Sequence, residues 1–450
     1  MQVPQALIQS LQHIAGFEPS AFEQVHASGD QVVSIRLNPA KPIPSPIIKL
    51  NGGVPWCDHG YYLKERPFFT FDPLLHAGAY YVQEASSMFV WQALQQLMPD
   101  QAGKKVLDVC AAPGGKSTLL ASHFKDGLVV ANEVIKNRAA ILVENISKWG
   151  TAAAVVTNND PSHFQSLPGY FDLILADAPC SGSGLFRKDP DAIDHWSEDN
   201  VVLCSQRQQR ILSDMLPALK EEGILIYSTC SYSEAENEAI ADWLIAEMGM
   251  KSMTLELNAD WGIIETSAKD SGATGYRFYP NRLMGEGFYL AAFQKQRSEG
   301  YKKQKPNQIN FLSKNEIQQL EASLPLKEGL SYFLQSGAIR GIPEQWMAEI
   351  GLLASHLYIK KAGVEIGSLK GKDLVPAHEL ALSGLIKSHF SSLEIDLEQA
   401  LLYLKRKDLV LNGPNGWNLL QYCGLSLGWV KVLPNRINNY YPAQWRILKD

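Results

Sequence analysis

A glycine-rich turn lies between an apolar run and a helix-like segment at residues 108–120, "DVCAAPGGKSTLL". Such a turn lets backbone N–H groups approach a ligand closely where a helix begins. Glu133 lies 18 residues beyond Gly115, at the end of the next apolar run, where a carboxylate suits a ribose diol. The turn lacks the third glycine of the dinucleotide fingerprint, so a ribose-bearing ligand without a pyrophosphate fits better. With Asp160 after the third run as a partner for an adenine amino group, this set predicts an S-adenosylmethionine (SAM) site.

Two cysteines stand in further polar segments that follow apolar runs. Residues 177–191, "DAPCSGSGLFRKDPD", put Asp177 and Cys180 beside a proline and glycines, residue types that core packing alone does not require. Residues 228–238, "STCSYSEAENE", put Cys230 before a predicted helix, whose N-terminus would lower the pKa of the thiol. We expect that helix to open with a capping box formed by Ser233 and Glu236.

Two thiols beside a methyl donor point to methylation of cytosine at C5. That carbon is too poor a nucleophile to take the methyl group directly, but addition of a thiolate at C6 makes C5 electron-rich. Addition also needs a hydrogen bond or a proton at N3 and N4 of the base, a task that suits the Asp177 carboxyl group. A second thiol would assist the later expulsion of the first. The positions of Cys180 and Cys230 do not decide which of them attacks.

Short apolar runs that alternate with helical segments must position these residues. Strands are predicted at 106–109, 128–133, 152–158, 171–177, 223–230 and 288–294, and helices near Ser117, over about 200–219 and after Ser233. This alternation predicts an α/β fold with a doubly wound, Rossmann-like parallel sheet covered by helices on both faces. Ligands bind outside the carboxyl ends of the strands in such sheets, so the polar strand ends are expected to meet at one edge.

The remaining chain predicts smaller modules around this catalytic domain, which we assign to residues 76–298. Residues 1–75 form an α/β lead-in, and a Lys-, Gln- and Pro-rich linker after residue 298 leads to a small α/β module at 310–390. Residues 391–450 form a last unit rich in turns and aromatic residues. The composition, 46% hydrophobic and 20% charged, is ordinary for globular domains, and the sequence has neither a signal-peptide pattern nor a long apolar run. We expect a cytoplasmic, monomeric protein without a membrane segment.

The distribution of charge and the spacing of the cysteines indicate which partners and ligands the protein could bind. The net charge is −6, but residues 301–450 carry 18 basic and 13 acidic side chains, including "YKKQKP" at 301–306 and "LKRK" at 404–407. A basic tail on an acidic body is compatible with RNA binding by the tail, although either stretch could equally be a solvated surface. The six cysteines lack the spacing of a disulfide framework or a zinc site, so we expect free thiols and no metal.

The motifs resemble a known family. "DVCAAPGGKS", "DAPCSGSGLFRKDP" and "STCSYSEAENE", together with "IRLNPAK" at 35–41 and "YYVQEASSM" at 80–88, stand in the order of the Nol/Nop/Sun group of SAM-dependent RNA cytosine-C5 methyltransferases. The resemblance covers most of residues 30–295. The tail, with "GLSLGWVK" and "NNYYPAQWRI", looks like the PUA-like RNA-binding end of the RsmF-type branch, which modifies small-subunit ribosomal RNA.

Carried over residue by residue, the resemblance implies that Cys230 is the nucleophile and that Cys180 assists release. The SAM contacts that it implies are Cys110, Ala111, Ala112, Pro113, Gly114, Gly115, Lys116, Glu133, Asp160 and Asp177. Arg138 is a separate candidate for a position beside the cofactor. Arg187 and Lys188 are candidates for phosphate contacts that flank a flipped base, whereas His195 and Trp196 are better explained by packing.

Two alternatives to ribosomal RNA methylation remain at this stage. The same catalytic core serves transfer-RNA methylation, and an RNA-binding assembly factor could keep the fold without turnover. The intact cysteines, glycine turn and acidic strand ends argue against the factor, and the tail favours the ribosome.

Overall fold

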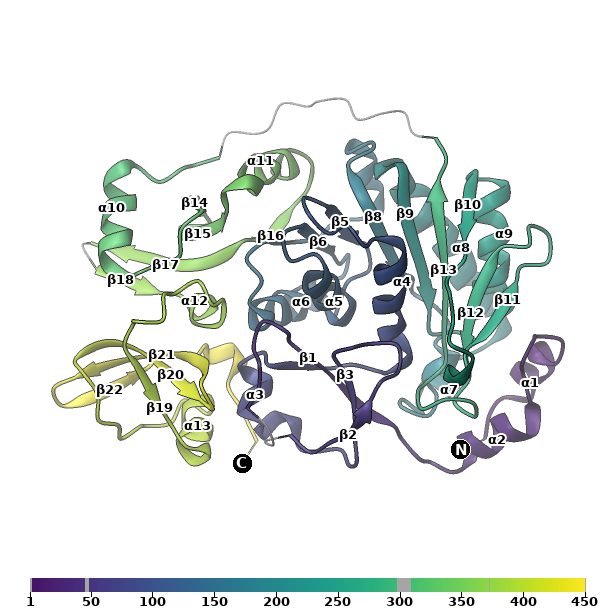
Figure 1. Cartoon of the computed structure of the whole chain (residues 1–450), viewed down its shortest axis with the longest axis horizontal. Coiled ribbons are helices and arrows are strands. Elements are labelled where there is room, and N and C mark those ends of the chain that lie inside the picture. The colour runs from purple at the N-terminus through teal and green to yellow at the C-terminus, as the bar shows by residue number, and fades with distance from the viewer. Residues whose placement is uncertain (1, 45–47, 298–308, 372, 450) are drawn as a thin grey trace.

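The structure is a computed structural model that describes residues 2–44, 48–297, 309–371 and 373–449. These residues form a large central sheet, one small sheet before it in the chain and two small sheets after it (Figure 1). The basic stretch at 301–306 and most of the predicted linker lie outside the described residues.

The central sheet has the predicted α/β architecture. Its parallel strands are β5 (Lys105–Asp108), β6 (Leu128–Asn132), β7 (Ala154–Thr157), β8 (Phe171–Asp177) and β9 (Leu219–Thr229), and β13 (Phe288–Lys295) runs antiparallel to β9. The order is β11-β12-β13-β9-β8-β5-β6-β7-β16, and β10 (Met250–Met253) pairs with β13. The strands added at the edges are β11 (Ile264–Ser267), β12 (Thr274–Phe278) and β16 (Ile359–Ala362). Because β6 and β8 both lie next to β5, the chain reverses its direction across the sheet between β5 and β8, which is where such sheets bind ligands.

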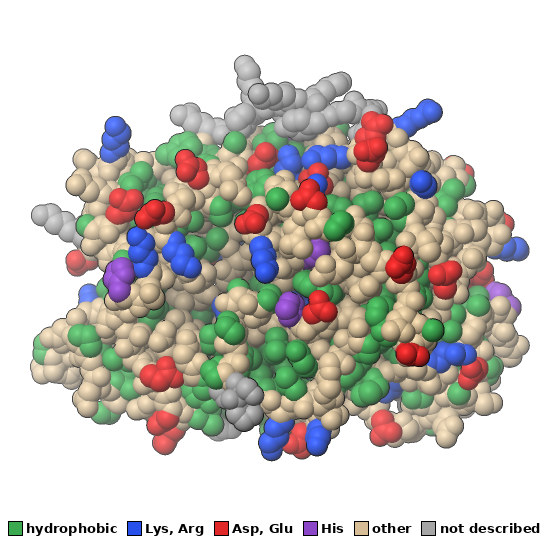
Figure 2. Space-filling view, viewed as in Figure 1, with side chains coloured by type: hydrophobic (Ala, Val, Ile, Leu, Met, Phe, Trp, Pro, Cys, Tyr) green, Lys and Arg blue, Asp and Glu red, His purple; other side chains and the backbone are tan. Residues whose placement is uncertain are grey.

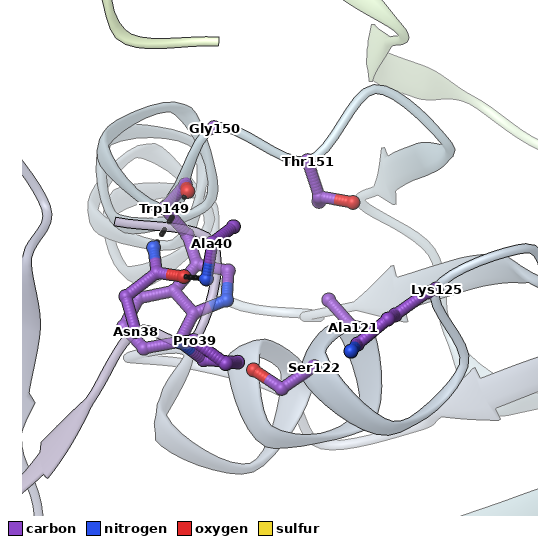
Figure 3. Close-up of a pocket in the computed structure, with 9 residues that line it drawn as sticks. All are labelled: Asn38, Pro39, Ala40, Ala121, Ser122, Lys125, Trp149, Gly150 and Thr151. Carbon is purple, nitrogen blue, oxygen red and sulfur yellow. Dashed lines mark hydrogen bonds between the residues drawn. The ribbon is translucent and has the colours of Figure 1, made fainter. Parts of the chain in front are cut away.

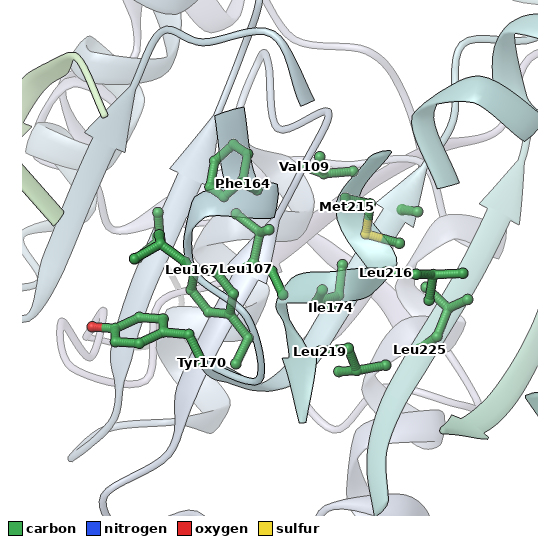
Figure 4. Packing of buried hydrophobic residues seen from close by; sticks show 14 of the residues in the cluster. Leu107, Val109, Phe164, Leu167, Tyr170, Ile174, Met215, Leu216, Leu219 and Leu225 are labelled. Carbon is green, nitrogen blue, oxygen red and sulfur yellow. The ribbon is translucent and has the colours of Figure 1, made fainter. Parts of the chain in front are cut away.

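Both faces of this sheet are buried. Successive side chains of each strand point to opposite faces, and each face packs against its own apolar cluster. On one face, Leu107, Ile174 and Leu225 pack against a layer that contains Phe164, Met215 and Leu216 (Figure 4). On the other face, Val106, Leu173 and Ile226 belong to a second cluster. The continuous apolar runs in the sequence therefore reflect strands that are covered on both sides.

Helices on the two faces connect these strands. They are α4 (Val90–Leu97), α5 (Gly115–His123), α6 (Lys136–Trp149), α7 (Ala192–His195), α8 (Glu198–Met215) and α9 (Glu238–Ala246). The capping box predicted after Cys230 is wrong. Within the described chain, Ser233 makes no side-chain cap bond, the residues after it form a short 3-10 turn, η6 (Glu234–Glu236), and α9 begins only at Glu238. The Glu236 side chain instead turns inward, as described below.

The N-terminal module packs against the start of α5. It consists of α1 (Gln5–Leu11), α2 (Pro19–Ala27), β1 (Val33–Leu37), β2 (Leu50–Gly53), β3 (Gly60–Leu63), α3 (Pro73–His76) and β4 (Tyr80–Val82). Its sheet has the order β2-β3-β1-β4, so it extends past the predicted boundary at residue 75. Arg36, only 1% exposed, donates to Gly115 O at 3.1 Å and to Thr118 Oγ1 at 2.5 Å. The "IRLNPAK" segment therefore holds the first turn of α5.

Two modules follow the central sheet in the chain. The first contains α10 (Lys314–Ser323), β14 (Leu330–Gln335), β15 (Ala338–Pro343), α11 (Met347–His356), β17 (Val364–Lys370), β18 (Asp373–Pro376) and α12 (His378–Leu382). The second contains β19 (Ser392–Glu394), α13 (Leu397–Leu404), β20 (Gly416–Tyr422), β21 (Leu425–Leu433) and β22 (Arg436–Asn439). Strand β16 leaves the first module and pairs antiparallel with β7, so residues 359–362 belong to the central sheet.

Acidic and basic side chains are interspersed over the face seen in Figure 2. No helix among the described residues is both long enough and apolar enough to span a bilayer.

Candidate active site

A cavity of about 160 Å³ lies at the ends of β5 and β8, at the reversal point of the sheet. The N-terminal module, the glycine-rich turn and the two strand ends line it: Tyr81, Val82, Gln83, Glu84, Ser87, Asp108, Cys110, Ala111, Ala112, Pro113, Gly115, Lys116 and Asp177. A larger cavity of about 310 Å³ lies elsewhere, between residues 38–40 of the N-terminal module and segments at α5 and the end of α6 (Figure 3). None of the predicted site residues lines the larger cavity.

The glycine-rich turn is held from the side of α6. Arg138 Nη2 donates to Ala112 O at 2.7 Å, and Asn145 Nδ2 donates to Pro113 O at 2.8 Å. Gly114 has φ +119°, and a Cβ at this position would lie 3.3 Å from Leu142 Cδ1. The left-handed backbone and the close packing together explain why the turn uses glycine here.

Asp108 ends β5 beneath this turn and was not among the predicted site residues. Its side chain is fully buried, and Oδ2 accepts a hydrogen bond from Ser117 Oγ at 2.6 Å. Oδ1 has no hydrogen-bond partner among the described residues, although Asp108 lines the cavity. Burial raises the pKa of this carboxyl group to about 7. A buried acceptor without a partner at a cavity wall is suited to a ligand donor.

Asp177 is fixed by two donors at the other strand end. Lys116 Nζ lies 2.7 Å from Asp177 Oδ2, and Ser228 Oγ donates to Oδ1 at 2.8 Å. Burial lowers the pKa of Lys116, but the charge and the hydrogen bond of Asp177 outweigh it, so the net pKa is raised and the ammonium form is favoured. The Lys116–Asp177 pair therefore presents a fixed, polar wall to the cavity.

Glu133 and Arg138 lie together behind the turn. The Glu133 side chain is 3% exposed, its Oε1 accepts a hydrogen bond from Ile135 N at 2.9 Å, and its Oε2 lies 3.4 Å from Arg138 Nη1. Arg138 therefore connects the carboxylate after β6 with Ala112 of the turn.

Asp160 follows β7, but it does not line the cavity that Asp108 and Asp177 share. It caps the 3-10 turn η3 (Pro161–Ser166) by accepting from Ser162 N at 3.1 Å, and its Oδ2 lies 3.3 Å from Arg210 Nη1. These donors hold the carboxylate on the side of η3 and α8.

The two predicted cysteines meet. Cys180 Sγ lies 3.1 Å from Cys230 Sγ, although the residues are 50 positions apart in the chain. Parallel pairing of β8 with β9, which sets Asp177 opposite Ser228, brings their strand ends together. The hydrogen bond with Cys230, followed by burial, raises the pKa of Cys180 well above its ordinary value. The raised pKa favours the protonated thiol of Cys180, and either sulfur can donate in this contact.

The electrostatic surroundings of Cys230 differ from those predicted. Since α9 begins only at Glu238, a helix N-terminus does not directly follow Cys230. Lys116 is a cation close enough to interact with Cys230: its pKa is raised chiefly by Asp177, and Cys230 adds to this effect.

Cys110 is a different kind of thiol, because burial raises its pKa beyond the usual range.

The two candidate phosphate-binding residues, Arg187 and Lys188, differ in exposure. Arg187 is 6% exposed, and its Nη2 donates to Asp30 O at 2.5 Å, so the predicted RNA contact is replaced by an internal link to the N-terminal module. Lys188 is exposed, as expected for a residue that could contact phosphate. His195 is exposed, and Trp196 packs beside a buried apolar cluster, which agrees with the packing role expected for Trp196.

Sequence reasoning missed Ser228 as well as Asp108. Both positions had a usable signal, because each ends or nearly ends a predicted strand at the ligand edge. The described residues contain no group of three or more His, Cys, Asp or Glu side chains arranged to hold a metal ion.

Three family models match segments of this chain. Residues 95–294 match the model of the 16S rRNA methyltransferase RsmB/F family. Residues 3–85 match the N-terminal domain of 16S rRNA methyltransferase RsmF, and residues 390–447 match the methyltransferase RsmF PUA domain.

Whole-chain relatives agree with the family models. The ribosomal RNA small subunit methyltransferase F of Shewanella piezotolerans is 30% identical over 438 residues, which cover 93% of this chain and 91% of that protein. The protein of the same name from Psychromonas ingrahamii is 32% identical over 416 residues, covering 87% and 84%. Among solved structures, a methyltransferase homolog protein from Pyrococcus horikoshii superposes with a TM-score of 0.53 at 27% identity, over 65% of this chain and 100% of that one. The chain therefore belongs to the 16S rRNA methyltransferase RsmB/F family and carries the N-terminal and PUA domains of its RsmF members.

Proposed function

We propose that this protein uses SAM to form 5-methylcytidine in small-subunit ribosomal RNA through a covalent bond from Cys230 to C6 of a flipped cytosine. The observation that carries the proposal is the 3.1 Å contact of Cys180 Sγ with Cys230 Sγ at adjoining strand ends. Asp177, at the end of β8, borders the cavity, and Ser228, which donates to it, lies two residues before Cys230 in the chain. The names of the relatives support ribosomal RNA as the substrate.

The residues around the cavity fit SAM. Asp108 Oδ1, buried and without a partner among the described residues, suits the ammonium group of the methionine part. Glu133 suits the ribose diol, and the turn at 110–116 brings backbone close to the ligand. Asp160 remains a candidate for the adenine amino group, which would share the carboxylate with Ser162 and Arg210. When bound, SAM supplies an electrophilic methyl group.

Asp177 is the group that activates the base in this proposal. Lys116 and Ser228 hold its two oxygens, so its orientation is set before substrate arrives. Hydrogen bonding between this carboxyl group and the N3–N4 edge of cytosine lowers the cost of adding a thiolate at C6.

The two thiols have different tasks. The Cys230 thiolate forms the S–C6 bond, and the C5=C6 electron pair becomes available at C5, which takes the methyl group. The C5 proton then passes to water, the electron pair of that C–H bond restores C5=C6, and the S–C6 bond breaks with its electrons on Cys230 sulfur. Cys180, which keeps its own proton 3.1 Å from this sulfur, assists the departure of Cys230.

The C-terminal modules position the RNA in this proposal. Residues 301–450 carry five more basic than acidic side chains, whereas the whole chain has a net charge of −6. Phosphate contacts orient a nucleic acid without reading its sequence, which leaves the chemistry to the central sheet.

Exchange of each cysteine tests the mechanism. Purified Cys230→Ala protein should transfer no methyl group from radiolabelled SAM to small ribosomal subunits that lack the modification, and it should form no covalent complex. Cys180→Ala protein should methylate but stay attached to RNA, which appears as a slow band on a denaturing gel. Cys423→Ser, in the last module, is the matched control and should behave as wild type.

The same assay contains the opposing outcomes. If the Cys230→Ala protein formed a covalent complex with RNA and the Cys180→Ala protein did not, the roles of the two thiols would be reversed. Transfer to transfer RNA alone would refute the ribosomal target, and absence of transfer from wild type to any RNA would refute the enzymatic function. Bisulfite sequencing of the product RNA identifies the modified base.

A further inference from the structure

Glu236 lies beneath the thiol pair and contacts the residue that follows each cysteine. Ser181, next to Cys180, donates to Glu236 from its backbone N at 2.8 Å and from its Oγ at 2.6 Å. Ser231, next to Cys230, donates from its Oγ at 2.5 Å. One carboxyl group therefore joins the loop after β8 to the loop after β9.

The carboxyl group is itself held rigidly. Glu236 is fully buried, Gln208 Nε2 of α8 donates to its Oε1 at 3.3 Å, and Tyr227 OH of β9 donates to its backbone O at 2.6 Å. A buried acceptor with this many donors costs free energy to disturb, because its hydrogen bonds are lost away from water; the Ser181 peptide N–H loses its bond to the carboxyl group.

Bonds that do not involve Glu236 also join the two loops. Ser181 Oγ lies 3.2 Å from Ser231 Oγ. Gly184 N donates to Cys230 O at 2.8 Å, and Tyr232 N donates to Ser183 Oγ at 2.9 Å. Glu236 accepts the peptide N–H that follows Cys180 and also binds the hydroxyl groups of Ser181 and Ser231, so it fixes the part of the first loop next to Cys180.

We propose that Glu236 is a positioning residue that keeps the Cys180 and Cys230 sulfur atoms in contact by joining the residues that follow them. The mechanistic consequence rests on the proposed function, since the proximity of the thiols serves the departure of Cys230 from the methylated base. The charge of Glu236 also contributes to the raised pKa of Cys180, which favours the protonated thiol there.

Thiol cross-linking tests this proposal without RNA or methyl transfer. Diamide takes two electrons and two protons from a pair of thiols, becomes the hydrazine and leaves one disulfide. Wild-type protein should form the Cys180–Cys230 disulfide rapidly, as measured by peptide mass spectrometry. Glu236→Ala should form it roughly tenfold more slowly, because a displacement of about 1 Å is enough to remove most of a proximity effect. Glu236→Gln, which keeps the length and an acceptor oxygen, should stay within roughly threefold of wild type.

Glu234→Gln is the matched control, because Glu234 lies on the same turn but pairs with His13 in a partly exposed ion pair. SAM affinity and melting temperature, measured in parallel, identify variants that are simply unfolded. If Glu236→Ala does not fold, Glu236→Asp decides the question, since its carboxyl group is one methylene too short to reach both loops. Cross-linking at the wild-type rate by a folded Ala or Asp variant overturns the proposal.

Methylation provides the second readout. Glu236→Ala should lower kcat and lengthen the lifetime of the RNA adduct while SAM affinity is unchanged, and Glu236→Gln should restore both. A folded Glu236→Ala variant with wild-type kcat and adduct lifetime would overturn the mechanistic part. If wild-type protein methylates no RNA, the proposed function fails, but the disulfide rates still decide the role of Glu236.

Discussion

At the scale of single residues, the site depends on carboxyl groups whose surroundings differ sharply. Asp177 has both oxygens engaged by Lys116 and Ser228. Asp108 has one engaged oxygen and one without a partner among the described residues. The first arrangement fixes the orientation of the group that we propose to meet the substrate, and the second leaves an acceptor atom free for the proposed ligand.

Asp108 leads to a prediction about pH. Its pKa is raised to about 7, so the carboxylate that would accept the SAM ammonium is lost as the pH falls below 7. SAM should therefore bind more weakly at pH 6 than at pH 8, as measured by isothermal titration calorimetry. Asp108→Asn should bind about tenfold more weakly at pH 8, because a hydrogen bond to a charged group is removed, and should lose most of the pH dependence. Asp100→Asn, at an exposed position, is the control. A wild-type pH profile in Asp108→Asn would contradict the assignment.

At the scale of secondary structure, the notable element is the edge strand β16. It comes from the module after the central domain and pairs with β7, which ends just before the turn that carries Asp160. Asn159 reinforces this pairing, because its Oδ1 accepts from Tyr358 N at 2.9 Å and its Nδ2 donates to Tyr358 O at 3.1 Å. The C-terminal module is thereby connected to a strand end of the ligand edge.

Removal of this amide should weaken the central sheet measurably. Asn159→Ala loses two hydrogen bonds to the Tyr358 backbone, so the free energy of unfolding should fall by about 2 kcal/mol, although Tyr358 O keeps its bond from Asn158 N. Urea denaturation monitored by circular dichroism measures this change. Asn51→Ala, at an exposed position, should change stability by less than about 0.5 kcal/mol. Equal stability of both variants would show that β16 is held by other contacts alone.

At the scale of the whole molecule, the N-terminal module and the last C-terminal module meet beside the catalytic domain. His76 Nδ1 lies 3.0 Å from Tyr441 OH, and Lys41 Nζ donates to Lys148 O at the end of α6 at 2.6 Å. His378 packs edge-on against Tyr441 in the same junction. These contacts make the orientation of the PUA domain part of the folded structure rather than a property of a linker alone.

The junction should weaken in acid. Burial, followed by the charge of Lys148, lowers the pKa of His76 to about 4, whereas the unfolded residue titrates near its ordinary value of 6.5. Between pH 6.5 and 4 the unfolded chain therefore binds a proton that the folded chain does not, and stability falls as the pH falls through this window. The shift corresponds to at most about 3 kcal/mol. Urea denaturation at pH 7 and pH 4.5 should show a smaller loss for His76→Gln than for wild type, whereas His389→Gln, at an exposed position, should lose as much as wild type. Identical losses in all three proteins would rule out His76 as a source of acid sensitivity.

The sequence by itself determined the features that depend on neighbours along the chain. Strand β8 was predicted with its observed bounds, 171–177, and the glycine turn before α5 was recognisable because apolar runs and turn-forming residues are local signals. The rule that parallel strands end at one edge of a sheet then predicts that Asp177, Cys180 and Cys230 lie at the ligand edge.

Only the tertiary structure decided what each polar side chain meets. Glu236 was predicted to cap a helix but turns inward to Ser181 and Ser231, because buried donors from two loops compete better than a single cap. Arg187 was a candidate for a phosphate contact but is buried, and β16 pairs with a strand roughly 200 residues earlier in the chain. Burial and hydrogen bonding across such separations depend on how distant segments pack, which local periodicity does not encode.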